Sequence, residues 1–171
     1  MKANHTPRIL FGEDAYLKAL LYFDIGNMSE ALPHVQLAFD QSPTKELGLL
    51  LYQVFIREKR YFEVQALAGH SLLSDMRWDL YANLTTEAFN HADFTASAAA
   101  GAVAYEIRSD PNLAYNVACA YAGDFKPQEA LKWLALAVTG GFGNKVLLAS
   151  DPDLDSLRSN PEFDLIAARL G

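Results

Sequence analysis

A set of residues recurs every 33 positions along this chain of 171 residues. At this spacing small and large side chains fall into separate columns, as the close packing of helices requires. The columns are Ala19, Tyr52, Thr85 and Ala118; Tyr22, Phe55, Ala88 and Tyr121; Met28, Tyr61, Phe94 and Pro127; Ala31, Val64, Ser97 and Ala130; and Ala38, Ser71, Ala104 and Ala137. A fixed period of this length is typical of a solenoid of stacked helical hairpins, so the repeat predicts an all-α fold.

Helix-breaking residues divide each repeat into two helices. Gly26-Asn27 separates the first pair, Ser42-Pro43 closes the first repeat, and Asp93 is the expected N-cap of a later helix. The predicted pairs are 12–25 with 29–41, 45–58 with 61–74, 78–90 with 94–108, and 112–122 with 127–139. A short helix at 145–149 and two further helices at 153–158 and 161–170 are expected to cover the apolar end of the array.

The pattern inside each repeat is similar to that of the tetratricopeptide-repeat family. That family has a small residue and an aromatic three positions apart late in the first helix, then a turn, then two small residues seven apart in the second. The last repeat shows all of these as Ala118, Tyr121, Gly123-Asp124, Ala130 and Ala137, and the first shows Ala19, Tyr22, Gly26-Asn27, Ala31 and Ala38. The Thr-Pro-Leu-His signature of the ankyrin repeat is absent, so residues 12–144 resemble a tetratricopeptide array.

The C-terminal segment strengthens this resemblance. Residues 151–163 read Asp-Pro-Asp-Leu-Asp-Ser-Leu-Arg-Ser-Asn-Pro-Glu-Phe, similar to a segment that often closes bacterial arrays of this family. The resemblance implies a right-handed superhelical α-solenoid of about four repeats and a C-terminal helical cap. The implied boundaries are an N-terminal extension at 1–11, repeats at 12–44, 45–77, 78–110 and 111–144, and capping helices at 145–171.

In this family the first helices of successive repeats line a concave groove that binds a partner protein. The resemblance therefore implies that the N-terminal half of the groove is apolar and that its C-terminal half is rich in side-chain amides. In the C-terminal half, Asn83 and Asn116 occupy equivalent positions and are expected to pair with the backbone of a ligand. The groove residues implied are Tyr16, Leu17, Leu20, Phe23, Leu49, Leu50, Gln53, Ile56, Arg57, Asn83, Thr86, Phe89, Asn90, Tyr115, Asn116 and Cys119.

Composition excludes several classes of function. The 21 acidic and 14 basic residues give a net charge of −7, which argues against a surface that binds nucleic acid. The sequence contains no run of about 18 apolar residues, so it predicts no membrane span. Residues 1–12 lack the charged and apolar segments of a secretion signal. We therefore expect one domain in the cytoplasm.

Motifs for chemistry are weak. Cys119 is the only cysteine and has no basic neighbour in sequence, and His34, His70 and His91 lie in different repeats. No set of nucleophile, base and oxyanion donors is recognisable, so we expect no enzyme activity, no cofactor and no metal. The acids Asp151, Asp153, Asp155 and Glu162 do match four positions of a calcium loop, but Ser156 stands where that loop needs glycine.

The expected function is that of a non-catalytic scaffold, an adaptor or chaperone-like module whose groove binds a peptide or helix of another protein. Only Arg57 is basic on the groove face, whereas Glu13, Glu46 and Asp79 border it, so a neutral or mildly basic segment suits it better than an acidic tail. The alternative is a self-associating assembly protein, such as a homodimer, with Phe142 and Phe163 as further contacts.

Overall fold

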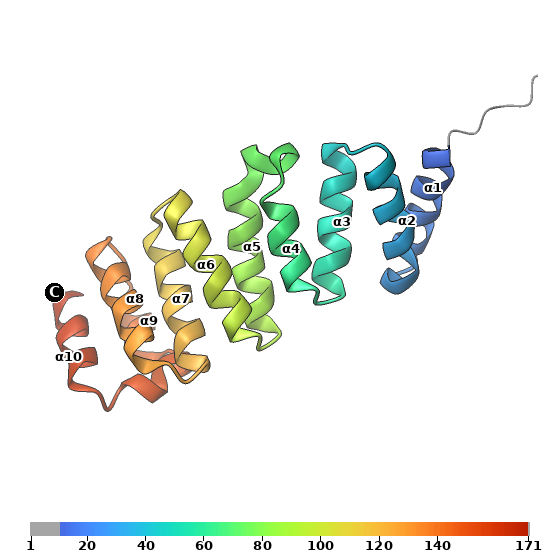
Figure 1. The fold of residues 1–171 in the computed structure, drawn as a ribbon. Helices are drawn as coiled ribbons and strands as arrows, with labels where there is room; N and C mark the ends of the chain where they lie inside the picture. Colours follow the sequence, from blue (N-terminus) through green and yellow to red (C-terminus); the bar gives the residue numbers. More distant parts are fainter. Residues whose placement is uncertain (1–10, 171) are drawn as a thin grey trace, which may run out of the picture. The chain divides into compact units, whose positions relative to one another are not determined.

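A computed structural model describes residues 11–170, with side chains from Asp14 onward. Every regular element in this range is a helix, which confirms the all-α fold (Figure 1). The predicted N-terminal extension lies outside the described residues except for Phe11, the first residue of α1. Contacts within the chain form two compact units, residues 1–74 and 75–171, where the length of the chain suggested one domain.

The first unit contains two helical hairpins in which consecutive helices pack together. Asn27 and Thr44 begin the second and third helices, because their side chains accept hydrogen bonds from the N–H groups of Glu30 and Leu47 at 3.3 and 3.2 Å. Val35, Val54 and other apolar side chains are fully buried between the helices. The elements are α1 (Phe11–Asp24), α2 (Met28–Gln41), α3 (Lys45–Arg57) and α4 (Tyr61–Ala68).

One helix is shorter than predicted. The sequence predicts a helix over 61–74, but α4 ends at Ala68, and the 3₁₀ helix η1 (Ser71–Met76) follows it. Gly69 weakens the helix at this point. The His70 side chain then accepts a hydrogen bond from the N–H of Leu72 at 3.2 Å, which favours a tight turn over a continued helix.

The second unit contains two longer hairpins and a helical tail. The carboxylate of Asp93 accepts a hydrogen bond from the N–H of Ala96 at 3.0 Å, so the predicted N-cap is confirmed. Asp110 caps the next hairpin in the same way, at 2.8 Å from the N–H of Asn112. The elements are α5 (Arg77–Asn90), α6 (Phe94–Ile107), α7 (Pro111–Gly123), α8 (Pro127–Thr139), α9 (Lys145–Ser150), η2 (Pro152–Leu157), α10 (Pro161–Ala167) and η3 (Ala168–Leu170).

The 33-residue period reappears in the backbone. The turn of each hairpin contains one residue with positive φ: Gly26 at 78°, Lys59 at 57°, Ala92 at 59° and Phe125 at 56°. In every turn the following N–H group donates to the carbonyl five residues before it, at 2.8 to 2.9 Å. The four turns thus share one left-handed helix-ending geometry, although only the first has the glycine that adopts it without strain.

The repeated small residues lie where the helices approach most closely. Ala31, Val64, Ser97 and Ala130 have no exposed surface, and all but one member of the last column are also buried. The exception is Ser71, which is exposed because α4 has already ended. Within residues 11–170 no helix is long and apolar enough to cross a membrane.

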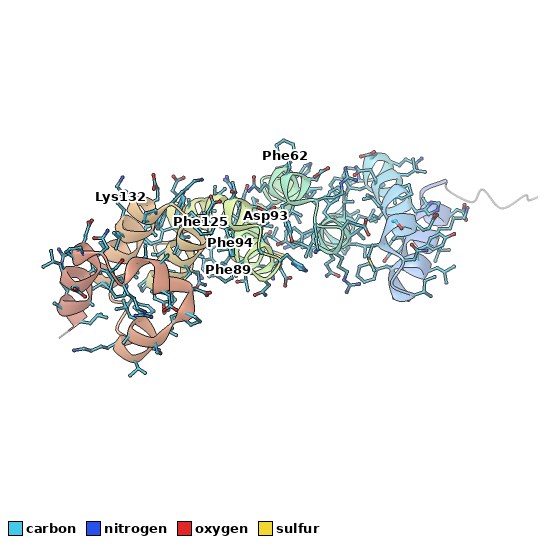
Figure 2. All side chains as sticks on the ribbon, turned by 90° about the horizontal axis from the view of Figure 1, so that it is seen from below. Phe62, Phe89, Asp93, Phe94, Phe125 and Lys132 are labelled. Carbon is cyan, nitrogen blue, oxygen red and sulfur yellow. The ribbon has the colours of Figure 1, made fainter. Side chains whose placement is uncertain are left out.

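Aromatic side chains differ sharply in their surroundings. Phe94 packs edge-on against Phe89, with ring centroids 5.2 Å apart, and so joins α5 to α6. Phe62 on α4 and Phe125 in the α7–α8 turn are instead 82% and 89% exposed (Figure 2). The two most exposed aromatic side chains among the described residues thus lie apart from the core, one in each unit.

Candidate binding cavity

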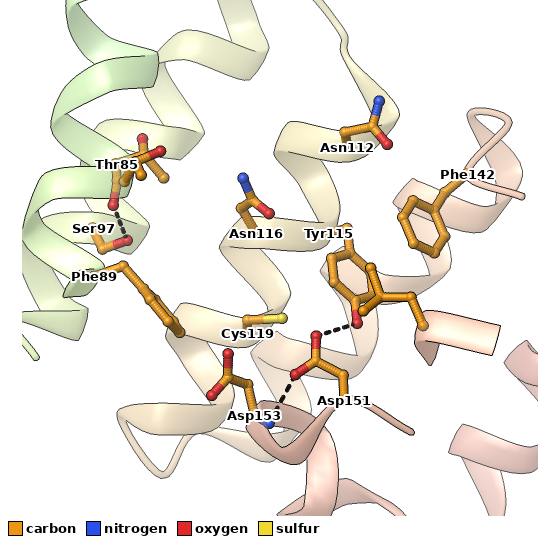
Figure 3. Close-up of a pocket in the computed structure, with 12 residues that line it drawn as sticks. Thr85, Phe89, Ser97, Asn112, Tyr115, Asn116, Cys119, Phe142, Asp151 and Asp153 are labelled. Carbon is orange, nitrogen blue, oxygen red and sulfur yellow. Dashed lines mark hydrogen bonds between the residues drawn. The ribbon is translucent and has the colours of Figure 1, made fainter. Parts of the chain in front are cut away.

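A cavity of about 260 Å³ lies within the second unit. Its walls come from α5 and α7, with one residue of α6, and from the segment that follows α8 (Figure 3). This volume is slightly below the ~300–1,000 Å³ of typical small-molecule pockets, so it suits one side chain rather than a whole helix. The lining residues are Thr85, Thr86, Phe89, Ser97, Asn112, Tyr115, Asn116, Cys119, Phe142, Leu147, Asp151 and Asp153.

Two stacked aromatic rings form one wall. The rings of Tyr115 and Phe142 lie 4.3 Å apart between centroids and only 7° from parallel, and both residues are buried. The turn after α8 places Phe142: Gly141 has a φ of 107°, and the N–H of Phe142 donates to the carbonyl of Ala137 at 2.9 Å. Phe89 lies on the opposite side of the cavity (Figure 3).

Hydrogen bonds fasten the tail to α7. The Tyr115 hydroxyl donates to Oδ2 of Asp151 at 2.7 Å, across 36 residues of sequence. Oδ1 of Asp151 accepts from the N–H of Asp153 at 3.0 Å and so caps η2. The Arg158 guanidinium donates to the backbone carbonyls of Leu148 and Asp151 at 3.2 and 2.8 Å. The carboxylate of Asp151 is therefore held in one place at the cavity.

Two carboxylates and a thiol lie close together along one side of the cavity. Ligand atoms of Cys119, Asp151 and Asp153 lie within 4.8 Å of one another. Burial raises the pKa of the Cys119 thiol, and the two carboxylates raise it further. Burial also raises the pKa of the Tyr115 hydroxyl, with its hydrogen bond to Asp151 as the next cause. The pKa of Asp153 is raised by burial first and by the charge of Asp151 second.

These shifts decide what the thiol can do. A thiol whose pKa is raised stays protonated near neutral pH, and the protonated form is a poor nucleophile. Cys119 is also 4% exposed. The arrangement therefore suits binding better than covalent chemistry at Cys119.

Exposed amides stand at the edge of the cavity. Asn112 and Asn116 lie one turn apart on α7, and both are exposed. Their side chains have no hydrogen-bond partner among residues 11–170. Each amide can donate and accept, so the pair can bind a polar ligand such as a peptide backbone.

The structure brings together five of the seven residues predicted for the C-terminal half of the groove. Thr86, Phe89, Tyr115, Asn116 and Cys119 all line the cavity. Tyr115 and Cys119 are almost completely buried rather than open on a groove face, because they pack against the tail. The remaining two, Asn83 and Asn90, are exposed on α5 and do not line it.

The amides that line the cavity differ from the predicted pair. Asn116 lines the cavity without Asn83, and its companion is Asn112 on the same helix. Sequence reasoning also missed two lining residues of α5 and α7 and all those that other elements contribute, although the tail motif holds two of the latter. The missed lining residues are Thr85, Ser97, Asn112, Phe142, Leu147, Asp151 and Asp153.

The residues predicted for the N-terminal half lie on α1 and α3 of the first unit. Tyr16, Leu17 and Gln53 are exposed, and Arg57 places its guanidinium carbon 4.4 Å from the centre of the Phe23 ring. This cation–π contact occupies the one basic side chain expected in the groove. The partly buried members of the set are Leu20, Phe23, Leu49, Leu50 and Ile56.

The acids of the tail do not converge as a calcium loop would require. The Asp155 carboxylate accepts a hydrogen bond from Nε of Arg158 at 2.9 Å, and neither it nor Glu162 belongs to the cluster with Asp151. The acids instead cap helices and pair locally.

The histidines have local packing roles. His34 stacks on Tyr22 with ring centroids 5.6 Å apart, and His70 meets Phe39 edge-on at the same distance. Nδ1 of His91 lies 2.8 Å from the carbonyl of Glu87. These contacts account for the three residues within their own units.

A comparison of the chain with models of protein families finds no match, and a search of the curated proteins finds none either. The cavity itself is therefore the basis for a functional proposal.

Proposed function

We propose that this protein is a non-catalytic interaction module, a tetratricopeptide-like scaffold whose second unit binds a segment of a partner protein. The observation that carries the proposal is a cavity with a buried aromatic wall and two unpaired amides at its edge, Asn112 and Asn116. Apolar walls with a few polar groups are typical of binding sites. The protonated thiol of Cys119 argues against nucleophilic catalysis at the same place.

The test uses a random peptide-display library, selected on the purified full-length chain. Asn116→Trp places a bulky side chain at the cavity edge, and Asn90→Trp is the matched control, because Asn90 is an exposed amide that does not line the cavity. Circular dichroism verifies that both variants fold. We expect selected peptides to bind the wild type and Asn90→Trp equally and Asn116→Trp at least about tenfold more weakly, a difference of ~1.4 kcal/mol. Equal binding to all three proteins would refute this site.

Self-association is a second candidate, favoured by the exposed face of α1. Leu17 and Leu21 on α1, and Ile25 directly after its end, are spaced four residues apart and are 64%, 60% and 66% exposed. Phe142 and Phe163 do not belong to this candidate interface, because both are 5% exposed in the core of the second unit. Sedimentation velocity at high micromolar concentration tests the idea: a dimer that dissociates in Leu21→Glu supports it, and a monomeric wild type rules it out.

A further inference from the structure

The charged side chains that line the cavity indicate which charge its ligand carries. Asp151 and Asp153 place two carboxylates beside a cavity whose other walls are apolar or neutral. Among the described residues, neither carboxylate forms an ion pair. The Arg158 guanidinium donates to the Asp155 side chain and to the backbone carbonyls of Leu148 and Asp151 instead. The described residues thus place no cationic side chain in direct contact with either carboxylate.

We propose that the cavity receives the side chain of a lysine or arginine from an extended segment of a partner protein, with Asp151 and Asp153 as its counter-charges. This inference rests on the proposed function, because it names the partner chemistry for the same cavity. A cationic side chain combines a charged head with an apolar stem. The carboxylates suit the head, and the rings of Phe89 and Tyr115 suit the stem.

The hydrogen bonds of the two acids leave capacity for a ligand. Asp151 already accepts from the Tyr115 hydroxyl and from the N–H of Asp153, which fixes its orientation. Asp153 is exposed and lines the cavity, and its carboxylate accepts no hydrogen bond from a described residue. One carboxylate is thus preorganised and the other is free, so a cation bound between them needs little rearrangement of the protein.

The amides explain why an extended backbone is expected. Residues four apart on a helix are separated by ~6 Å along its axis. Two residues of an extended chain span ~6.6 Å. Asn112 and Asn116 are therefore spaced to pair with alternate peptide units along one edge of an extended segment, while a side chain between them enters the cavity.

The test is an array of peptides, each with one fixed central residue and randomised flanks, probed with the full-length protein. We expect retention on the arrays with central lysine or arginine, and little on those with norleucine, citrulline or glutamate. Asp153→Asn removes one cavity charge, and Asp164→Asn is the matched control because Asp164 is exposed and does not line the cavity. The preference for a cationic centre should fall about tenfold or more in Asp153→Asn, as for loss of a charge-assisted hydrogen bond, and persist in Asp164→Asn.

The outcomes separate this inference from the function on which it rests. Retention on non-cationic arrays that is lost in Asn116→Trp would overturn the cationic preference and leave the peptide-binding proposal intact. Retention that is insensitive to Asn116→Trp, or absent on every array, would overturn both. The remaining alternative is that the cavity binds a metal ion, which calorimetric titration with Ca²⁺ and Zn²⁺ tests. Heat of binding that disappears in Asp153→Asn, together with no preference for cationic residues on the arrays, would identify a metal site and refute the proposal.

Discussion

Replacing Gly101 with alanine tests whether α6 and α7 pack as closely as the structure shows. A Cβ atom at this position would lie 2.3 Å from Cγ2 of Val117, far inside the ~3.5–4.0 Å of favourable carbon contacts. Val117 is fully buried and β-branched, so its side chain has little freedom to turn away. Removing a glycine from a helix interior stabilises by ~1 kcal/mol, but overpacking costs ~1–3 kcal/mol. We expect net destabilisation on the order of 1 kcal/mol.

The assay is urea unfolding followed by tryptophan fluorescence and by circular dichroism. The two tryptophans, Trp78 and Trp133, both lie in the second unit, so their fluorescence reports on the unit that contains Gly101. Gly48→Ala is the milder comparison, because a Cβ there would lie 3.3 Å from a ring carbon of Phe39 and 3.5 Å from Leu73, a much smaller overlap than at Gly101. Measured by circular dichroism, it should destabilise the protein less than Gly101→Ala does.

A double variant separates the clash from other effects. Val117→Ala removes the methyl group that the new Cβ would meet, so Gly101→Ala should be less harmful in that background than in the wild type. Contacting residues commonly show coupling of ~0.5–3 kcal/mol in such cycles. If Gly101→Ala stabilises the protein and shows no coupling to Val117, the close approach of α6 and α7 is wrong.

Three further perturbations test other parts of the second unit. Ala130→Leu adds volume at a position with no exposed surface and should lower the free energy of unfolding by ~1–3 kcal/mol, so an unchanged urea midpoint would contradict the packing. The native pKa of Asp153 is raised, so ionisation of its carboxyl destabilises the folded state as pH rises through that pKa. Asp153→Asn removes this ionisation and should therefore raise the melting temperature at neutral pH. That gain should vanish below the ordinary aspartate pKa of ~3.9, and a gain independent of pH would exclude charge as its cause. Native Cys119, buried and with a raised pKa, should react with iodoacetamide far more slowly than after unfolding in urea, and equal rates would show that the thiol is accessible.

The repeat made much of the local structure predictable. Helix boundaries follow from caps such as Asp93 and from turn residues such as Gly26, because these groups act on neighbours within a few positions. The failure at 61–74 has the same local origin, since Gly69 and the His70 side chain end α4 early. A period alone does not reveal where one repeat departs from the others.

The cavity was only partly predictable. Residues on the first helices, such as Thr86 and Asn116, follow from their register in the repeat. The sequence pattern of the tail acids matches a calcium loop only in part, whereas in the structure Asp151 caps η2. Its second contact, with the Tyr115 hydroxyl, belongs to tertiary packing and has no signature in the spacing of residues.

The sequence by itself determined that this chain is helical, where its hairpins turn, and which small residues lie between its helices. These properties depend on backbone conformation and side-chain size, which a 33-residue pattern records directly. Only the tertiary structure decided that a buried aromatic pair, two unpaired amides and two carboxylates without an ion pair among the described residues surround one cavity. The physical reason is distance along the chain: Tyr115 and Asp151 are 36 residues apart, and they meet only because the tail folds back onto α7.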